Sequence, residues 1–298
     1  MKEKKRGFSS VKPYSRRVKK HPFIKLLSSF FGLFVKDAEI IYSEPLPENE
    51  GVIIVSNHAI DYGPKVFLLS YKRKARHWGD SALCYQKTVH DHSMLYFFPD
   101  AHGIGKFFAH IFSFILSFIL PPIFRGLEVI PVYRSTKIVT TFEKTAETIA
   151  ENKDVIIFPE TEVKNPNYKY VNNLNNGFIR VANYCYRQTG RVVKFYPAYA
   201  CKSLNKLLIG NPITIDPEVS EKSQLRDFKR KISDEIERLA MTLPEHPITP
   251  FNLATDRPEF LRQELVKKYG DNEKYSYKDL REHLLKEKEK ADQLKGDQ

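Results

Sequence analysis

Residues 51–64 of the chain read GVIIVSNHAIDYGP, and this stretch decides the fold class. Its first six residues are rich in β-branched side chains, which is typical of a buried strand in an α/β sheet. Gly63 can cap a helix whose first residue is Pro64, so a helix is predicted from Pro64 to about Arg73. Residues 57–61 then form a loop between strand and helix, where α/β proteins usually carry their functional side chains.

Strands and helices alternate along the chain that follows. The residue pattern predicts helices at 136–152, 177–188 and 221–241, and strands at 127–133, 154–158, 192–200 and 206–215. This alternation predicts an α/β fold with a mostly parallel, mixed sheet that is flanked by helices on both faces. We assign residues 1–40 to a basic arm with an amphipathic helix, 41–250 to the α/β domain and 251–298 to a charged helical tail.

The net charge of +12 is concentrated at the N-terminus, where residues 1–20 hold nine Lys or Arg and a single Glu. Residues 22–35 follow, and place Phe23, Leu27, Phe30 and Phe34 on one helical face. A basic arm leading into an aromatic amphipathic helix fits an anionic lipid surface. A core-packing helix and a nucleic-acid-binding arm are the alternatives.

The most hydrophobic segment is 106–124. Its polar residues Lys106, His110, Ser113 and Ser117 recur at spacings that gather them into one helical stripe. We expect the adjacent prolines 121 and 122 to end this helix after about fifteen residues, or roughly 22 Å, short of the roughly 30 Å of a bilayer core. The segment is therefore expected to lie in a membrane interface or to line a buried channel, with a core helix as the alternative.

Several common site types are not indicated. The three cysteines are far apart and lack C-x-x-C spacing, which argues against disulfides and zinc and for a reducing cytosolic setting. No signal peptide is recognised. His90-Asp91-His92 matches no familiar metal spacing, so no metal is expected. The sequence has no Gly-rich phosphate loop and no G-x-S-x-G, which disfavours nucleotide hydrolases and the usual serine hydrolases.

His58 and Asp61 are the candidate catalytic pair. A neutral histidine can take a proton from an attacking hydroxyl, and a nearby carboxylate can orient the ring and stabilise the imidazolium. Residues three apart lie on one side of a helical turn, so the two side chains can meet. A loop histidine followed by a capping aspartate would give the same pattern.

Further segments add to this pair. Residues 56–61, 126–134 (GLEVIPVYR), 158–160 (FPE) and 192–197 (VVKFYP) resemble, in this order, the four motif blocks of the lysophosphatidic acid acyltransferase (PlsC-like) family. Residues 176–178 with Ala182, and 209–213, are also similar to that family, so the resemblance covers about 51–215.

The resemblance implies an O-acyltransferase that moves a fatty acyl group from acyl-CoA or acyl carrier protein to a lysophospholipid hydroxyl. The most direct acceptor is 1-acylglycerol-3-phosphate, which would give phosphatidic acid. It implies His58 as base and Asp61 as its partner, and no cofactor beyond the co-substrate. Such a protein would sit on the cytoplasmic side of the cell membrane, peripheral or monotopic, with no nucleic-acid partner. The acceptor would be bound by Asn57, Arg134, Glu160 and Lys164.

Two departures from the family pattern bear on substrate and activity. Only Ala59 and Ile60 separate His58 from Asp61, where the family has four residues. After Phe-Pro-Glu the family continues Gly-Thr-Arg, whereas this chain has residues 161–164 (TEVK), without the glycine and the arginine. Lys164 or Arg180 could replace the missing cation. Acylation of a different lipid, and a lipid-binding relative without catalysis, therefore remain alternatives.

Overall fold

The computed structural model describes residues 37–96, 105–133, 136–161 and 170–248, and the structural statements below concern these residues. The predicted amphipathic helix at 22–35, the charged tail at 251–298 and the predicted ligands Arg134 and Lys164 lie outside them.

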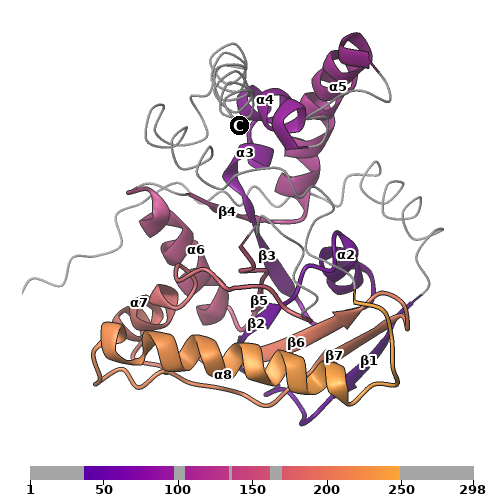
Figure 1. Cartoon of the computed structure of the whole chain (residues 1–298). Helices are drawn as coiled ribbons and strands as arrows, with labels where there is room; N and C mark the ends of the chain where they lie inside the picture. The colour runs from indigo at the N-terminus through magenta and orange to yellow at the C-terminus, as the bar shows by residue number, and fades with distance from the viewer. Residues whose placement is uncertain (1–36, 97–104, 134–135, 162–169, 249–298) are drawn as a thin grey trace, which may run out of the picture.

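A seven-stranded mixed sheet forms the centre of the domain, as predicted (Figure 1). Its order is β1-β7-β6-β2-β5-β3-β4. The five strands from β6 to β4 are mutually parallel, and β7 is antiparallel to β6 and parallel to β1. The strands are β1 (Glu39–Tyr42), β2 (Ile53–Ser56), β3 (Ala75–Asp80), β4 (Ile130–Val132), β5 (Asp154–Ile157), β6 (Phe195–Cys201) and β7 (Lys206–Ile209).

Helices cover both faces of this sheet because its central strands are apolar on both sides. In β2, Ile53 and Val55 belong to the core shared with α6, α7 and α8, while Ile54 belongs to the core shared with α2. A third group, α3 to α5, stands beyond the end of β3 (Figure 1). The helices are α2 (Tyr62–Leu69), α3 (Ser81–Cys84), α4 (Gln86–Tyr96), α5 (Gly105–Gly126), α6 (Ile138–Ala150), α7 (Arg180–Thr189) and α8 (Glu221–Met241).

Helix α5 corrects one prediction, because Pro121 and Pro122 lie inside it and it runs on to Gly126. Proline removes one backbone donor but has a helical φ, and the turn beyond is held by bonds such as Leu127 N–H to Ile123 O at 2.9 Å. The 22 residues span about 33 Å, so α5 is long and apolar enough to cross a membrane by length and composition. The prediction that this helix is too short to cross a membrane was wrong. The predicted polar stripe does face inward, since Ser113 and Ser117 are buried.

The amino ends of β2 and β5 are joined by a buried ion pair. Asp154, fully buried, accepts hydrogen bonds from Tyr71 Oη at 2.7 Å, Arg73 Nε at 2.7 Å and Nη2 at 2.9 Å, and the Val52 backbone N–H at 3.1 Å. Arg73 also donates to the carbonyls of Pro47 and Glu50. This cluster ties the segment before β2 to the start of β5, at the sheet edge opposite His58.

Candidate active site

Two of the four motif-like segments meet at the carboxyl edge of the parallel strands. His58 follows β2, and Glu160 follows the neighbouring β5. Parallel strands end at the same edge of a sheet, which brings residues 102 positions apart into contact. Tyr133, the residue before Arg134, follows β4 two strands further along and is buried.

Asn57 fixes the loop that carries His58. Its side-chain amide donates to the Ala200 carbonyl at 3.2 Å and accepts from the Ala200 N–H at 2.7 Å. The side chain is buried, so it imitates one more backbone pairing between β2 and β6. Asn57 is predicted from the sequence to bind substrate. In the structure, its side-chain amide holds the loop to the sheet.

The two residues between His58 and Asp61 have a left-handed backbone conformation. Ala59 and Ile60 have φ values of 46° and 61°, a region that is unfavourable for a non-glycine residue and most of all for a β-branched one. Gly63 N–H donates to His58 O at 2.9 Å. A Cβ at Gly63 would lie 2.5 Å from Asn57 O, so only glycine lets α2 start this close to the loop.

Asp61 and Glu160 occupy different surroundings. Asp61 stands before the first turn of α2 with its exposed carboxylate paired to Lys65, four residues on. The Glu160 carboxylate is buried and lies 3.8 Å from His58 Nδ1. The structure therefore brings Glu160, which we expected to contact the acceptor, to the histidine ring, and it brings Asp61 to a lysine.

Glu160 is held by two backbone amides. Its Oε2 accepts from the His58 N–H at 2.5 Å and its Oε1 from the Asn172 N–H at 2.8 Å. Burial raises the pKa of Glu160 to about 7, although the two N–H donors favour the carboxylate and oppose that shift. One carboxyl thus fixes the main chain under His58 and also faces its ring.

His58 is neutral at physiological pH. Burial lowers its pKa to about 3, although 24 % of its side chain remains exposed to solvent. Phe158 packs against it with ring centroids 5.0 Å apart. The centroid of the His77 ring lies 6.4 Å from that of Phe158, and His77 is also neutral because burial lowers its pKa to about 4. His77 was not predicted from sequence, since nothing in its local pattern marks β3 as a neighbour of the motif strands.

The buried carboxyl gives a pH dependence of stability that can be measured without substrate. The folded-state pKa of Glu160, about 7, exceeds its ordinary value of 4.5, so its contribution to stability is fully present below pH 4.5 and is lost as pH rises through 7. Between pH 4.5 and 7 the free energy of unfolding of wild type is therefore expected to fall relative to Glu160→Gln, by up to about 1.4 kcal/mol per pH unit.

Urea titrations of both proteins at a series of pH values measure this difference. His77 titrates in both proteins, so its opposite contribution cancels, whereas any change in the titration of His58, 3.8 Å from the carboxyl, is included in the measured difference. A difference between the proteins that does not change from pH 4.5 to 7 would show that Glu160 has an ordinary pKa.

The other residues predicted for the site either have other partners or fall outside the described residues. Arg180, the possible substitute for the missing arginine, begins α7, is largely exposed, and pairs with Glu221 at 3.4 Å. Tyr133 shares a hydrogen bond with the hydroxyl of Tyr85, and Lys137 Nζ lies 5.9 Å from its ring centroid. Over the described ranges, no group of three His, Cys, Asp or Glu side chains is placed to hold a metal ion.

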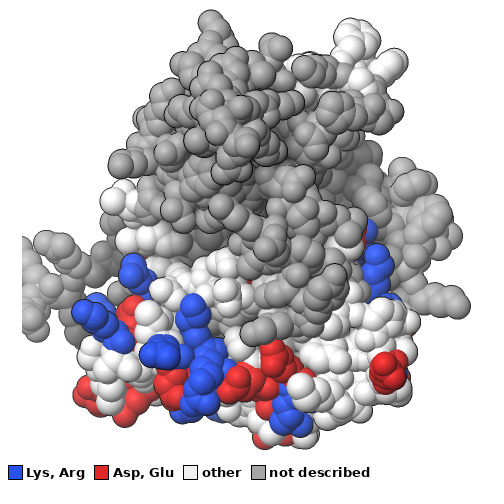
Figure 2. Space-filling model, in the orientation of Figure 1, with Lys and Arg blue, Asp and Glu red and all other residues white. Residues whose placement is uncertain are grey.

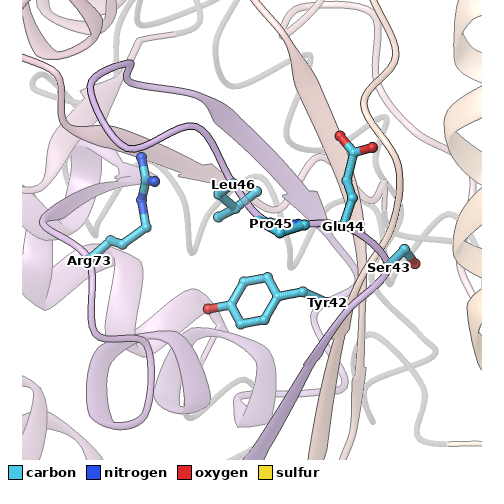
Figure 3. Close-up of a pocket in the computed structure, with 6 residues that line it drawn as sticks. All are labelled: Tyr42, Ser43, Glu44, Pro45, Leu46 and Arg73. Carbon is cyan, nitrogen blue, oxygen red and sulfur yellow. The ribbon is translucent and has the colours of Figure 1, made fainter.

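A pocket of about 390 Å³ lies at the opposite edge of the sheet (Figure 3). β1 ends at Tyr42 and runs antiparallel to β6, so this pocket is at the amino ends of β2, β5 and β6. Arg73 borders it, but its guanidinium is already bound to Asp154 and two carbonyls. The lining residues are Tyr42, Ser43, Glu44, Pro45, Leu46 and Arg73. The pocket is therefore separate from the His58 site.

Comparisons with known proteins give a likeness to a solved structure. No family model matches the sequence, and no curated protein is significantly similar to it. A crystal structure of the 1-acyl-sn-glycerophosphate (LPA) acyltransferase PlsC from Thermotoga maritima is similar at 13 % sequence identity, with a TM-score of 0.41, over 76 % of this chain and 83 % of that one. Because the sequence identity and the TM-score are low, any statement about the chemistry of this chain rests on its own residues.

Proposed function

We propose that this chain is an acyltransferase that moves a fatty acyl group from a thioester to a hydroxyl of a lipid, with His58 as general base. One arrangement carries the proposal: a neutral, accessible His58 lies at the carboxyl edge of the sheet, 3.8 Å from a buried carboxyl that also holds its backbone. The four motif-like segments in family order support the same chemistry.

The proposed reaction follows from this geometry. Nδ1 of His58 lies 3.8 Å from a carboxylate oxygen of Glu160, and we assign the proton transfer to Nε2. Nε2 takes the proton of the acceptor hydroxyl as its oxygen attacks the thioester carbonyl, and ionised Glu160 stabilises the imidazolium. Collapse of the tetrahedral intermediate breaks the carbon–sulfur bond, and the imidazolium returns the proton to the departing thiolate. Asp61, in contact with Lys65, would act through the position of α2.

The acceptor that we propose is a lysophospholipid, most directly 1-acylglycerol-3-phosphate, with phosphatidic acid as product. Arg134 and Lys164 are the proposed phosphate ligands, because Arg and Lys both pair with phosphate oxygens. The proposed donor is acyl-CoA or acyl carrier protein. Glu162, where the family has threonine, favours a less anionic lipid as the second candidate acceptor.

Incorporation of labelled acyl groups into a panel of lysolipids tests the proposal. Purified full-length protein, presented with vesicles, is given acyl-CoA or acyl carrier protein in parallel, and the labelled product identifies the acceptor. Labelled phosphatidic acid is the expected result. Failure of both donors with folded, vesicle-bound protein would refute acyl transfer and favour a lipid-binding relative.

We also propose that α5 binds the cytoplasmic face of the cell membrane in a peripheral or monotopic manner. Its polarity is inverted for a helix in water: Ser113 and Ser117 are buried while the large apolar side chains point outward. The part of α5 visible at the top of Figure 2 carries neither acidic nor basic side chains, which gather instead on the α8 side. The outward side chains are Phe107, Phe108, Ile111, Phe112, Phe114, Ile115 and Phe118.

Replacing two of these aromatic residues should weaken membrane binding. The double variant Phe112→Ser and Phe118→Ser is expected to bind vesicles containing anionic lipid at least about tenfold more weakly, because each ring loses apolar burial. Flotation measures the bound fraction. The matched control is Val139→Ser, which changes an exposed apolar residue of α6. Equal flotation of wild type and the double variant would contradict this role of α5.

A further inference from the structure

A buried histidine beyond α8, His246, has no part in the proposed chemistry. Its Nδ1 lies 2.7 Å from the Pro244 carbonyl oxygen, and a carbonyl can only accept, so Nδ1 carries a proton. Its Nε2 lies 2.9 Å from the Tyr199 hydroxyl, which therefore donates to it. Both bonds are satisfied by one neutral tautomer.

The rings of Tyr199 and His246 both contact a third ring. The centroid of Tyr170 lies 5.7 Å from that of Tyr199, with the planes nearly perpendicular, and 5.4 Å from that of His246. Tyr199 is on β6 and is 2 % exposed, and the other two rings come from the segment before residue 172 and from the chain after α8. We call Tyr170, Tyr199 and His246 the aromatic clamp. It joins three segments that are distant in sequence.

The clamp adjoins the hairpin that holds Glu160. Asn172, two residues beyond Tyr170, donates its N–H to Glu160 Oε1 at 2.8 Å. A short antiparallel pairing continues from there, with Thr161 N–H to Asn173 O at 2.7 Å and Asn175 N–H to Pro159 O at 2.8 Å. We call residues 159–161 and 172–175 the carboxylate hairpin. Burial raises the pKa of Tyr199, and the nearby Glu160 carboxylate adds to that shift. The phenol therefore stays protonated as a donor.

We propose that Tyr199 and His246 are positioning residues that hold the carboxylate hairpin, through Tyr170, so that Glu160 stays against His58. The path runs from His246 to Tyr199 by a hydrogen bond, from both to Tyr170 by ring packing, and from Asn172 through Glu160 to the His58 N–H. The consequence for catalysis rests on the proposed function, whereas the consequence for the hairpin does not.

Hydrogen exchange followed by mass spectrometry tests the proposal on the full chain without substrate. In Tyr199→Phe and His246→Ala, peptides covering residues 56–62 and 170–176 are expected to exchange about tenfold faster, because losing one buried hydrogen bond of about 1.4 kcal/mol favours local opening. His246→Gln is expected to restore protection, since its amide can donate to Pro244 O and accept from Tyr199. His246→Leu, which fills similar space without polar atoms, is expected not to restore protection, and rescue by leucine as complete as by glutamine would mean that His246 only fills space.

The control is Tyr71→Phe, which removes a buried phenol hydrogen bond to Asp154 at the opposite edge of the sheet. It is expected to lower global stability without selective exchange at 56–62 and 170–176. The proposal is overturned if the clamp variants leave both peptides protected, or accelerate them no more than Tyr71→Phe does.

A second readout separates this inference from the proposed function. In an active enzyme, Tyr199→Phe should lower kcat with little change in KM. A chain that shows the exchange pattern but transfers no acyl group would refute the activity and leave the clamp standing.

Discussion

The His58→Ala variant is expected to lose about a thousandfold in kcat/KM for acyl transfer, since a positioned general base commonly contributes that much. The substitution removes the ring but keeps the backbone N–H that binds Glu160, so the loop is expected to keep its course. Initial rates of labelled product formation measure the effect. A variant that retains a tenth of wild-type activity would exclude His58 as the base.

The matched control for His58 is His77→Gln. His77 is a second neutral histidine that contacts Phe158, but it is buried. The control should lose less than about tenfold, because it perturbs packing near the site without removing the base. Equal losses in the two variants would mean that both rings, rather than one, are needed.

The Asp154→Asn variant is expected to lower the free energy of unfolding by about 3 kcal/mol. Breaking a buried ion pair from one side typically costs 3–5 kcal/mol, and we take the lower end because 26 % of the Arg73 side chain is exposed. Asparagine has nearly the same shape, so the loss reports charge and hydrogen bonding rather than a cavity. Urea unfolding followed by circular dichroism measures it.

The control for Asp154 is Glu39→Gln, which breaks the exposed pair with Lys206 and should change stability by less than about 1 kcal/mol. Because Asp154 and His58 lie at opposite edges of the sheet, the rate per folded molecule should be unchanged in Asp154→Asn. A loss below 1 kcal/mol in Asp154→Asn would mean that hydrogen bonds to asparagine replace the ion pair.

The helices and strands that were predicted from the sequence are those whose own residues show a clear pattern of apolar side chains. The apolar runs at β2, β5 and β6 mark strands that are buried on both faces, and the periodic pattern of α8 gave its bounds as 221–241. The strand β3 was missed because its residues, ARHWGD, owe their conformation to pairing with β5 and β4. β1 was missed for a similar reason: it is an exposed strand at the edge of the described sheet, where β7 is its neighbour.

The candidate site could likewise be predicted only in part from the sequence. The sequence placed His58 in a strand-to-helix loop, as the structure does, and the parallel sheet explains why the first and third motif segments meet. The partner of the ring could not be read from spacing, because the direction of Asp61 depends on two left-handed residues before it. The bonds to Glu160 come from backbone amides of His58 and Asn172, and main-chain donors leave no mark in a sequence.

The position of α5 in the chain has a consequence for biosynthesis. α5 ends at Gly126, whereas the two strands that flank β2 begin only at Asp154 and Phe195. During translation the outward-facing aromatic helix therefore leaves the ribosome before the sheet can close around β2, at a stage when nascent chains with exposed apolar surface are prone to aggregate. A lipid surface or a chaperone that receives α5 at that moment would protect the nascent chain until β6 completes the core.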